Sequence, residues 1–294
     1  MKLAVFITGP IRYCNYVIQQ MDDLLSSNEI EYDFFLHLWI EDNSNTERDS
    51  QSSLYDVLKK LECIKSLTIE QPLDSGRIEK KYGTWTDTHS NVTSMFGMFI
   101  AINKLISILK VQPDYKEYTH ILRLRTDNVI LDPSNFLKCV DFNTDSVNIS
   151  FNPNISKEWV SDHIMLARKE IFIKIWGYTK FANFVKIFNK YARNPEYFLM
   201  SKISKCDRRY AWTRYVDYHI IYNPVKDYEP QILNNIIENI GVEGLFKAPV
   251  NNLDNKRELI AYAENIESKY HGHYSYINKF KRVLKRIINK KKAY

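Results

Sequence analysis

The sequence predicts an α/β fold: a doubly wound, mostly parallel sheet with helices on both faces and a helical C-terminal portion. Two observations predict it. Short apolar runs rich in β-branched and aromatic residues, typical of buried strands, alternate with segments of helical periodicity. Gly and Pro are scarce, at 8 and 9 of 294 residues, which argues against a disordered or collagen-like chain. Strands that alternate with helices are typical of a parallel sheet.

The elements are expected in a regular order. Residues 2–8 (KLAVFIT) form an apolar run that ends at Gly9-Pro10, and residues 32–39 (YDFFLHLW) form a second one. Between them, residues 13–25 have a helical pattern, and from 91 to 110 apolar residues recur at helical spacing. The other expected elements are a loop at 41–53, a short helix at 54–61, strands at 66–70, 121–124 and 147–151, and helices near 168–176, 178–192, 195–205 and 230–240.

Polar signatures follow three of the expected strands. They are Gly9–Arg12 after the first strand, Glu41-Asp42 after the second, and Arg125–Asn128 after the strand at 121–124. Parallel sheets of this class bind their ligands beyond the C-terminal ends of the strands. The sequence therefore predicts a binding site at this edge of the sheet.

Positive charge is concentrated near the end of the sequence. Residues 279–292 hold eight Lys or Arg residues and no acid, and without these eight charges the net charge of +6 becomes −2. A body so close to neutral argues against a nucleic-acid partner. Residues 276–294 have one apolar helical face and one basic face, as in helices that lie on anionic membrane surfaces. The alternative is a helix packed on the body with its basic face in water.

The four cysteines and the N-terminus bear on the compartment. Cys14, Cys63, Cys139 and Cys206 are widely spaced and form no CxxC pair, which fits a reducing cytoplasm and gives no zinc signal. The N-terminal apolar run is too short for a signal peptide. No membrane-spanning segment is expected. We therefore expect a cytoplasmic protein held at the inner face of the cytoplasmic membrane by residues 276–294.

The segment RLRTDN, residues 123–128, carries the strongest chemical signal. Asp127 at the end of a buried strand can ligate a divalent metal that bridges a diphosphate. Arg123 and Arg125 can bind phosphate oxygens through paired N–H donors. A nucleotide-sugar donor needs its leaving diphosphate neutralised in this way. The alternative is a purely structural Arg–Asp pair.

Two further motifs are weaker. Gly9 lets the backbone approach a ligand, and Arg12 can contact a nucleotide; an ordinary strand-to-helix turn is the alternative, and a GxGxxG fingerprint is absent. Asp162 can act as general base toward an acceptor hydroxyl, or else it belongs to a helix cap. His163 beside it can equally be a core histidine.

Taken together, these motifs resemble a known family. They occur in the order FITGPIRY, DFFLHLW, NVTSMFGMFIAINKL, YTHILRLRTDNVI, VSDHIMLARKEIF and YEPQIL. This order is similar to the GT-A-like glycosyltransferases of bacterial O-antigen and capsular polysaccharide gene clusters. The resemblance covers about residues 1–245. Residues 246–275 are then a C-terminal extension, and 276–294 the basic amphipathic helix.

The resemblance implies transfer of a hexose or related sugar from a nucleotide-sugar donor to a lipid-linked glycan acceptor. It implies that Asp127 meets the metal (Mn²⁺ or Mg²⁺) or the diphosphate. Gly9, Arg12, Arg123 and Arg125 would lie on the donor side. The acceptor side would hold Asp162, the candidate base, with His163 and Glu229; Glu229 is a second candidate for the base.

The chain departs from the family pattern at one position. Arg125 stands where other GT-A enzymes have the first Asp of an Asp-x-Asp motif, so a guanidinium can supply part of a metal's charge. Two other classes remain open. A sugar-phosphate nucleotidyltransferase would need a Gly-rich, Lys-containing phosphate loop near the N-terminus, which this sequence lacks. A non-catalytic membrane-surface adaptor would keep the basic segment but would not need Arg125, Asp127 and Asp162 to converge.

Overall fold

A computed structural model of the chain describes residues 1–11, 14–39, 58–59, 61–83, 92–130, 136–137, 142, 147–150, 162–191, 194–206, 210–213 and 218–220. The chain divides into two compact units, Met1–Lys226 and Asp227–Tyr294. Every described residue belongs to the first unit. The expected boundaries near residues 245 and 275 fall outside the described residues and stay a prediction.

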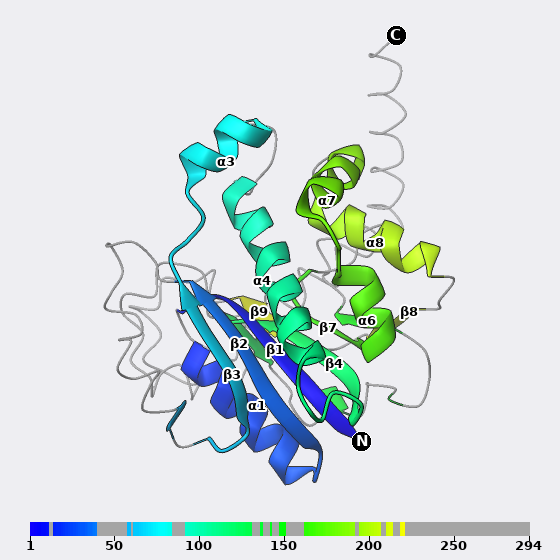
Figure 1. Cartoon of the computed structure of the whole chain (residues 1–294). Coiled ribbons are helices and arrows are strands. Elements are labelled where there is room, and N and C mark those ends of the chain that lie inside the picture. The colour runs from blue at the N-terminus through cyan, green and yellow to red at the C-terminus, as the bar shows by residue number, and fades with distance from the viewer. Residues whose placement is uncertain are drawn as a thin grey trace, which may run out of the picture. The chain divides into compact units, whose positions relative to one another are not determined.

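The first unit is built on a seven-stranded sheet (Figure 1). Strands β3, β2, β1 and β4 are parallel neighbours, β7 runs antiparallel to β4, and β6 and β8 complete the order β3-β2-β1-β4-β7-β6-β8. A separate antiparallel pair joins β5 to β9. The strands are β1 (Lys2–Pro10), β2 (Glu31–Trp39), β3 (Ile64–Glu70), β4 (Tyr118–Arg125), β5 (Asn128–Ile130), β6 (Val147–Ser150), β7 (Met165–Arg168), β8 (Tyr210–Thr213) and β9 (Tyr218–Ile220).

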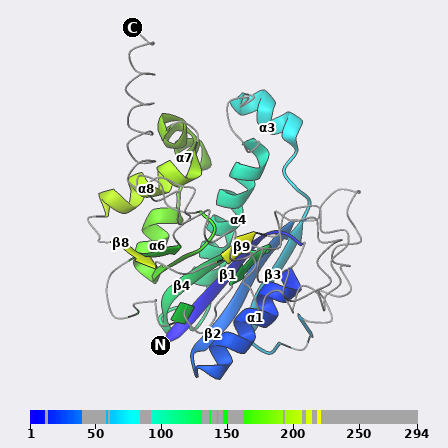
Figure 2. The same cartoon turned by 180° about the vertical axis from the view of Figure 1, so that it is seen from behind.

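Helices cover both faces of this sheet. Helix α1 lies on one face, and α4 and α6 lie on the other, as the front and back views show (Figures 1 and 2). Helices α7 and α8 pack on the α4 side. The helices are α1 (Cys14–Ser27), α3 (Ser75–Tyr82), α4 (Val92–Lys110), α6 (Lys169–Trp176), α7 (Phe181–Phe188), which continues into a 3-10 turn at Asn189–Tyr191, and α8 (Pro195–Lys205). The predicted mostly parallel, doubly wound sheet is confirmed.

The pleat of β1 explains the two layers. Leu3, Val5 and Ile7 belong to the core beneath α1, whereas Ala4 and Phe6 belong to the core beneath α4. Successive side chains of a strand point to opposite faces, so a strand covered on both sides needs a continuous apolar run. KLAVFIT is such a run, and the residues from Leu3 to Ile7 are at most 1% exposed.

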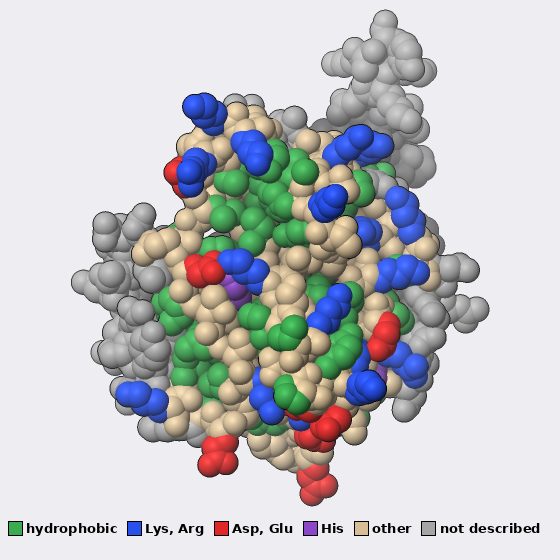
Figure 3. Space-filling model, viewed as in Figure 1, with side chains coloured by type: hydrophobic (Ala, Val, Ile, Leu, Met, Phe, Trp, Pro, Cys, Tyr) green, Lys and Arg blue, Asp and Glu red, His purple; other side chains and the backbone are tan. Residues whose placement is uncertain are grey.

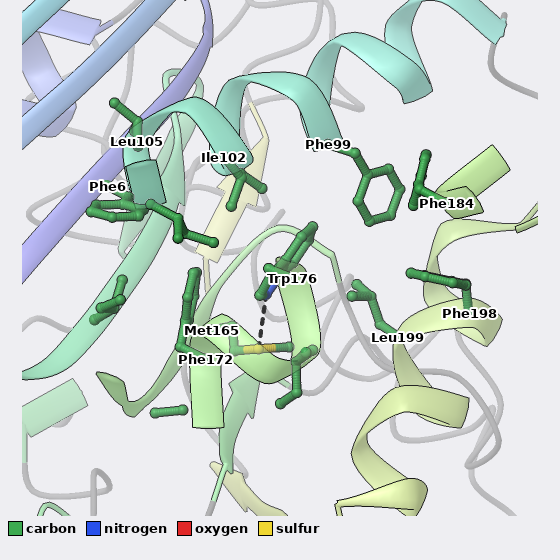
Figure 4. Packing of buried hydrophobic residues seen from close by; sticks show 14 of the residues in the cluster. Phe6, Phe99, Ile102, Leu105, Met165, Phe172, Trp176, Phe184, Phe198 and Leu199 are labelled. Carbon is green, nitrogen blue, oxygen red and sulfur yellow. Dashed lines mark hydrogen bonds between the residues drawn. The ribbon is translucent and has the colours of Figure 1, made fainter. Parts of the chain in front are cut away.

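The core under α4 is rich in aromatic side chains (Figure 4). Phe99 meets Trp176 of α6 at a ring-centroid distance of 5.3 Å and Phe184 of α7 at 4.7 Å. Phe198 of α8 packs edge-on against Phe99 at 5.5 Å. Trp176 also donates its indole N–H to Met165 Sδ at 3.1 Å. Because aromatic side chains bury large areas, these contacts fix α6, α7 and α8 against α4.

Helix α4 is long and apolar enough to span a membrane by length and composition, which the sequence reading did not anticipate. Ten of its nineteen residues are buried, and it packs on β1 and β2. This is the placement of a core helix.

Figure 3 shows the surface of the molecule from the direction of Figure 1. On this face, hydrophobic side chains gather where α3, α4 and α7 meet, and Lys and Arg side chains are distributed over the rest.

An ion network holds the N-terminal ends of the central strands. Lys2 Nζ lies 2.8 Å from Asp114 Oδ2 and 3.1 Å from Asp33 Oδ2, and Tyr118 donates its hydroxyl to Asp33. The hydrogen bond from Lys2 lowers the pKa of Asp114 to about 2. This network lies at the edge opposite the predicted binding site.

Several short elements were not predicted. Strands β5, β7, β8 and β9 have three or four residues each, too few for a periodic signal, and α3 has no buried residue. The strands at 2–8, 32–39, 66–70, 121–124 and 147–151 and the helices at 13–25, 91–110, 168–176, 178–192 and 195–205 are confirmed to within a few residues. The loop at 41–53, most of the short helix at 54–61 and the helix at 230–240 lie outside the described residues.

Candidate functional site

Arg125 and Asp127 form an ion pair at the C-terminal end of β4, in the middle of the sheet. Arg125 Nε donates to Asp127 Oδ1 at 2.8 Å, and Arg125 Nη2 donates to Asp127 Oδ2 at 2.9 Å. Asp127 is 1% exposed, whereas the Arg125 side chain is 27% exposed. The buried carboxylate therefore fixes the plane of a guanidinium that reaches solvent.

Gly9 closes the same edge from β1. Thr8 pairs with Arg125 in the parallel ladder, and the Thr126 N–H donates to the Thr8 carbonyl at 3.3 Å. Gly9 has φ of +144°, and a β-carbon there would lie 2.7 Å from Thr126 Oγ1. The close approach that requires glycine is thus to the residue between Arg125 and Asp127.

Two buried polar side chains flank Asp127. Thr126 and Asn128 are both 0% exposed. In the described part of the chain, Thr126 Oγ1 and both polar side-chain atoms of Asn128 find no hydrogen-bond partner. Buried polar groups are nearly always paired in proteins, so an unpaired one calls for an explanation such as a bound water, ion or ligand.

Asp162 and His163 reach the same edge from the segment that leads into β7. Met165 pairs with Arg123 and β7 runs antiparallel to β4, so the residues just before β7 lie at the C-terminal end of β4. Asp162 Oδ1 is 3.1 Å from His163 Nε2, and both residues are largely buried. Asp162 lies near enough to Arg123 and Arg125 for their charges to act on it.

The pKa values of this pair move in the same direction for different reasons. Burial opposes ionisation of Asp162, but the charges of His163, Arg123 and Arg125 outweigh it and hold the pKa of the carboxyl below its usual range. Burial lowers the pKa of His163 to about 4, and the two arginines add to this effect while Asp162 opposes it. At neutral pH the pair is an ionised carboxylate beside a neutral imidazole.

Glu196, which the sequence reading missed, belongs to the same site. It stands in the first turn of α8, where Asn194 caps the helix by accepting a hydrogen bond from the Tyr197 N–H at 2.7 Å. Burial and the negative charge of Asp162 raise the pKa of Glu196 to about 7, although Arg125 lowers it in part. The motif Asn-Pro-Glu predicts a helix start, but its place beside Asp162 depends on how α8 docks.

Arg123 lies beneath the others. It is 1% exposed, and its guanidinium sits 4.9 Å from the Trp176 ring centroid. Its charge still acts on Asp162 and His163. Arg123 therefore supports the site from within the core. Arg12, Glu229 and residues 276–294 lie outside the described residues, so their predicted roles stay predictions.

We refer to Arg123, Arg125, Asp127, Asp162, His163 and Glu196 as the strand-end cluster. It contains a guanidinium held in a fixed orientation, an ionised carboxylate and a carboxyl group that titrates near neutrality. Such a set can bind an anion and can also accept a proton. Across the described residues, no group of three or more His, Cys, Asp or Glu side chains could hold a metal ion.

Comparisons with known proteins give similarities in fold only. No protein-family model matches the sequence, and no curated protein is significantly similar to it. Among solved structures, one similar structure is the mannosyltransferase PcManGT from Pyrobaculum calidifontis, in complex with GDP-Man and Mn²⁺. It is 8% identical with a TM-score of 0.42, and the match covers 97% of this chain and 79% of the mannosyltransferase chain. The catalytic domain of Drosophila β1,4-galactosyltransferase 7, in complex with xylobiose, is 11% identical (TM-score 0.41; 78% and 75% covered). The galactosyltransferase LgtC, with donor and acceptor sugar analogues, is 13% identical (TM-score 0.40; 71% and 73% covered). At such values the overlap is partial, and a function has to be argued from the site.

Proposed function

We propose that the chain is a glycosyltransferase that takes a sugar from a nucleotide-sugar donor at the strand-end cluster. The observation that carries the proposal is the convergence of Arg125, held by Asp127, with Asp162 and Glu196 at one edge of the sheet. Arg125 supplies positive charge for a leaving diphosphate, and a carboxyl group beside it can take the proton of the attacking hydroxyl.

Glu196 is the better candidate for the general base. A base works best when its pKa lies near the working pH. The pKa of Glu196 is raised to about 7, whereas that of Asp162 is lowered, so Asp162 is the weaker base. Asp162 instead raises the pKa of Glu196 by its charge. Asp162, the base expected from the sequence, thus takes a supporting role in this proposal.

The unpaired polar groups beside Asp127 support a polar ligand at this edge. Leaving Thr126 and Asn128 unsatisfied costs about 1–3 kcal/mol for each buried group. A bound ligand or water that hydrogen-bonds to them would recover this cost. A non-catalytic adaptor would need neither these groups nor a titrating carboxyl, so the site favours an enzyme.

The acceptor and the location are proposed on the sequence alone. A lipid-linked glycan of surface polysaccharide synthesis, such as O-antigen or capsule, fits the family resemblance. Residues 276–294 would hold the enzyme on the inner leaflet, where such an acceptor lies, because each basic residue near an anionic surface adds about 1 kcal/mol.

A screen of nucleotide sugars by thermal unfolding tests the proposal. A ligand that binds only the native state at a hundred times its Kd adds about 2.7 kcal/mol of stability. For a chain of this size, that raises Tm by several degrees. We expect at least one nucleotide sugar to do so for the native chain and to lose its effect in Arg125→Gln. The matched control is Arg168→Gln, since Arg168 is exposed at the other end of the β4–β7 pairing.

A further inference from the structure

The hydrogen bonds that Asp127 accepts from Arg125 determine how a donor can bind. Its two carboxylate oxygens each accept a hydrogen bond from one guanidinium, at 2.8 and 2.9 Å. The carboxylate is 1% exposed and the guanidinium is the more exposed partner. A ligand that arrives from solvent therefore meets Arg125 before it meets Asp127.

A divalent cation does not fit this arrangement. Mg²⁺ and Mn²⁺ bind through carboxylate and other hard oxygen ligands. Each oxygen of Asp127 keeps a second lone pair, but the carboxylate is 1% exposed and a cation on it would stand beside the positive guanidinium of Arg125, which repels it. Asp162, which could assist, already has its Oδ1 atom 3.1 Å from His163 Nε2.

Arg125 can supply the charge that a metal would otherwise bring. A guanidinium remains protonated at every physiological pH and presents a planar fork that matches two phosphate oxygens. The bidentate pair with Asp127 engages Nε and Nη2 and fixes the plane of the guanidinium before a ligand arrives, so less conformational freedom is lost on binding.

We propose that Asp127 is a positioning residue that orients Arg125, and that Arg125 binds the diphosphate of the donor without a divalent metal. This inference rests on the proposed function, since it concerns the same donor. It assigns Asp127 a role toward a side chain of its own protein instead of a metal ion.

The test measures binding of UDP and of GDP to the full chain by calorimetry, once in EDTA and once in excess Mn²⁺. We expect one of them to bind at least as tightly in EDTA as in Mn²⁺. Electron paramagnetic resonance of Mn²⁺ gives a second readout that needs no nucleotide. The signal of free Mn²⁺ should not fall when protein is added.

Two variants separate the roles. Arg125→Gln should weaken binding about ten- to a hundredfold in both conditions, as expected for loss of a charged hydrogen-bonding partner. Asp127→Asn keeps the shape but turns one acceptor into a donor facing the guanidinium. This variant should weaken nucleotide binding in EDTA as well as in Mn²⁺. Loss of a metal ligand would weaken binding in Mn²⁺ alone. Arg168→Gln should bind like the native chain.

The outcomes are distinct. Binding in EDTA that depends on Arg125 supports the inference. Binding of UDP or GDP only in Mn²⁺, or a fall in free Mn²⁺ that Asp127→Asn abolishes, overturns the inference and leaves the proposed function standing. Failure of both nucleotides to bind in either condition contradicts the proposed function itself. The measurements on the native chain in EDTA and in Mn²⁺ distinguish these outcomes even if a variant fails to fold.

Discussion

Gly9 and Thr126 lie so close together that a β-carbon on Gly9 would be 2.7 Å from Thr126 Oγ1. This contact ties the end of β1 to the turn that carries Arg125 and Asp127. The φ of +144° at Gly9 adds a second constraint, because L side chains rarely adopt it.

We therefore expect Gly9→Ala to destabilise the protein on both counts. The backbone strain alone costs on the order of 1–3 kcal/mol. In a Thr126→Ala background, the same change should cost less, because the clash is gone and only the strain remains. Urea unfolding of the four proteins of this double-mutant cycle measures the difference.

Gly76→Ala in α3 is the matched control. Its β-carbon would stand at an ordinary 3.4 Å from Asp74 Oδ1, and a helical Gly→Ala change stabilises by up to about 1 kcal/mol. Equal costs at Gly9 in both backgrounds would show that Thr126 does not restrict this position.

The raised pKa of Glu196 predicts a specific pH dependence of stability. With a folded-state pKa of about 7 and an ordinary unfolded value, Glu196 binds more protons in the folded state between about pH 4.5 and 7. The contribution of protonated Glu196 to the free energy of unfolding is thus fully present below about pH 4.5 and is lost as the pH rises through 7. Glu196→Gln should match the native chain near pH 4.5 and exceed it in stability by about 1–3 kcal/mol at pH 8.

Chemical denaturation at both pH values checks this prediction. The pKa of His163, lowered to about 4, makes the native chain lose stability as the pH falls from 6.5 to 4. This contribution is common to both proteins and cancels in the difference between them. A variant that is no more stable at pH 8 would mean that Glu196 is not buried beside Asp162.

Trp176 links the core to the site, because it packs on Phe99 and supports the Arg123 guanidinium. Trp176→Ala should cost about 3–5 kcal/mol, the usual range for removing a large buried aromatic side chain. Tyr197→Ala serves as the control, since Tyr197 is 42% exposed. Urea unfolding that gave equal small losses for the two variants would contradict the packing in Figure 4.

Much of the fold follows from the sequence because its signals are local. KLAVFIT and YDFFLHLW are buried on both faces and read as continuous apolar runs, and the helix from 91 to 110 shows its period directly. Strand β7 was not predicted because it has only four residues and α6 begins at the next residue. Its partner is β4, more than 35 residues earlier, and no local pattern carries that pairing.

The candidate site divides in the same way. Arg125 and Asp127 share one strand end and could be found together, and their chemistry was visible in RTDN. Glu196 could not be found, because it meets Asp162 only through the docking of α8 on the aromatic core. The packing of Arg123 against Trp176 also depends on tertiary structure, so the burial of Arg123 could not be predicted from the sequence.

Residues 276–294 carry the proposed membrane contact. Deleting them should release the protein from anionic liposomes, since the deletion removes eight basic residues and one apolar helical face. Co-sedimentation with vesicles that contain anionic lipid measures this, and vesicles of neutral lipid are the control. Undiminished binding by the shortened chain would refute the role of this segment.

The most direct measurement of the central claim is the release of nucleoside diphosphate from a panel of nucleotide sugars, for the native chain, Asp127→Ala and Arg168→Gln. Circular dichroism confirms that each protein is folded. We predict that the native chain and Arg168→Gln release nucleoside diphosphate from at least one donor and that Asp127→Ala does not. Undiminished release by folded Asp127→Ala, or no release from any donor by the native chain, would contradict the assignment of glycosyl transfer to the strand-end cluster.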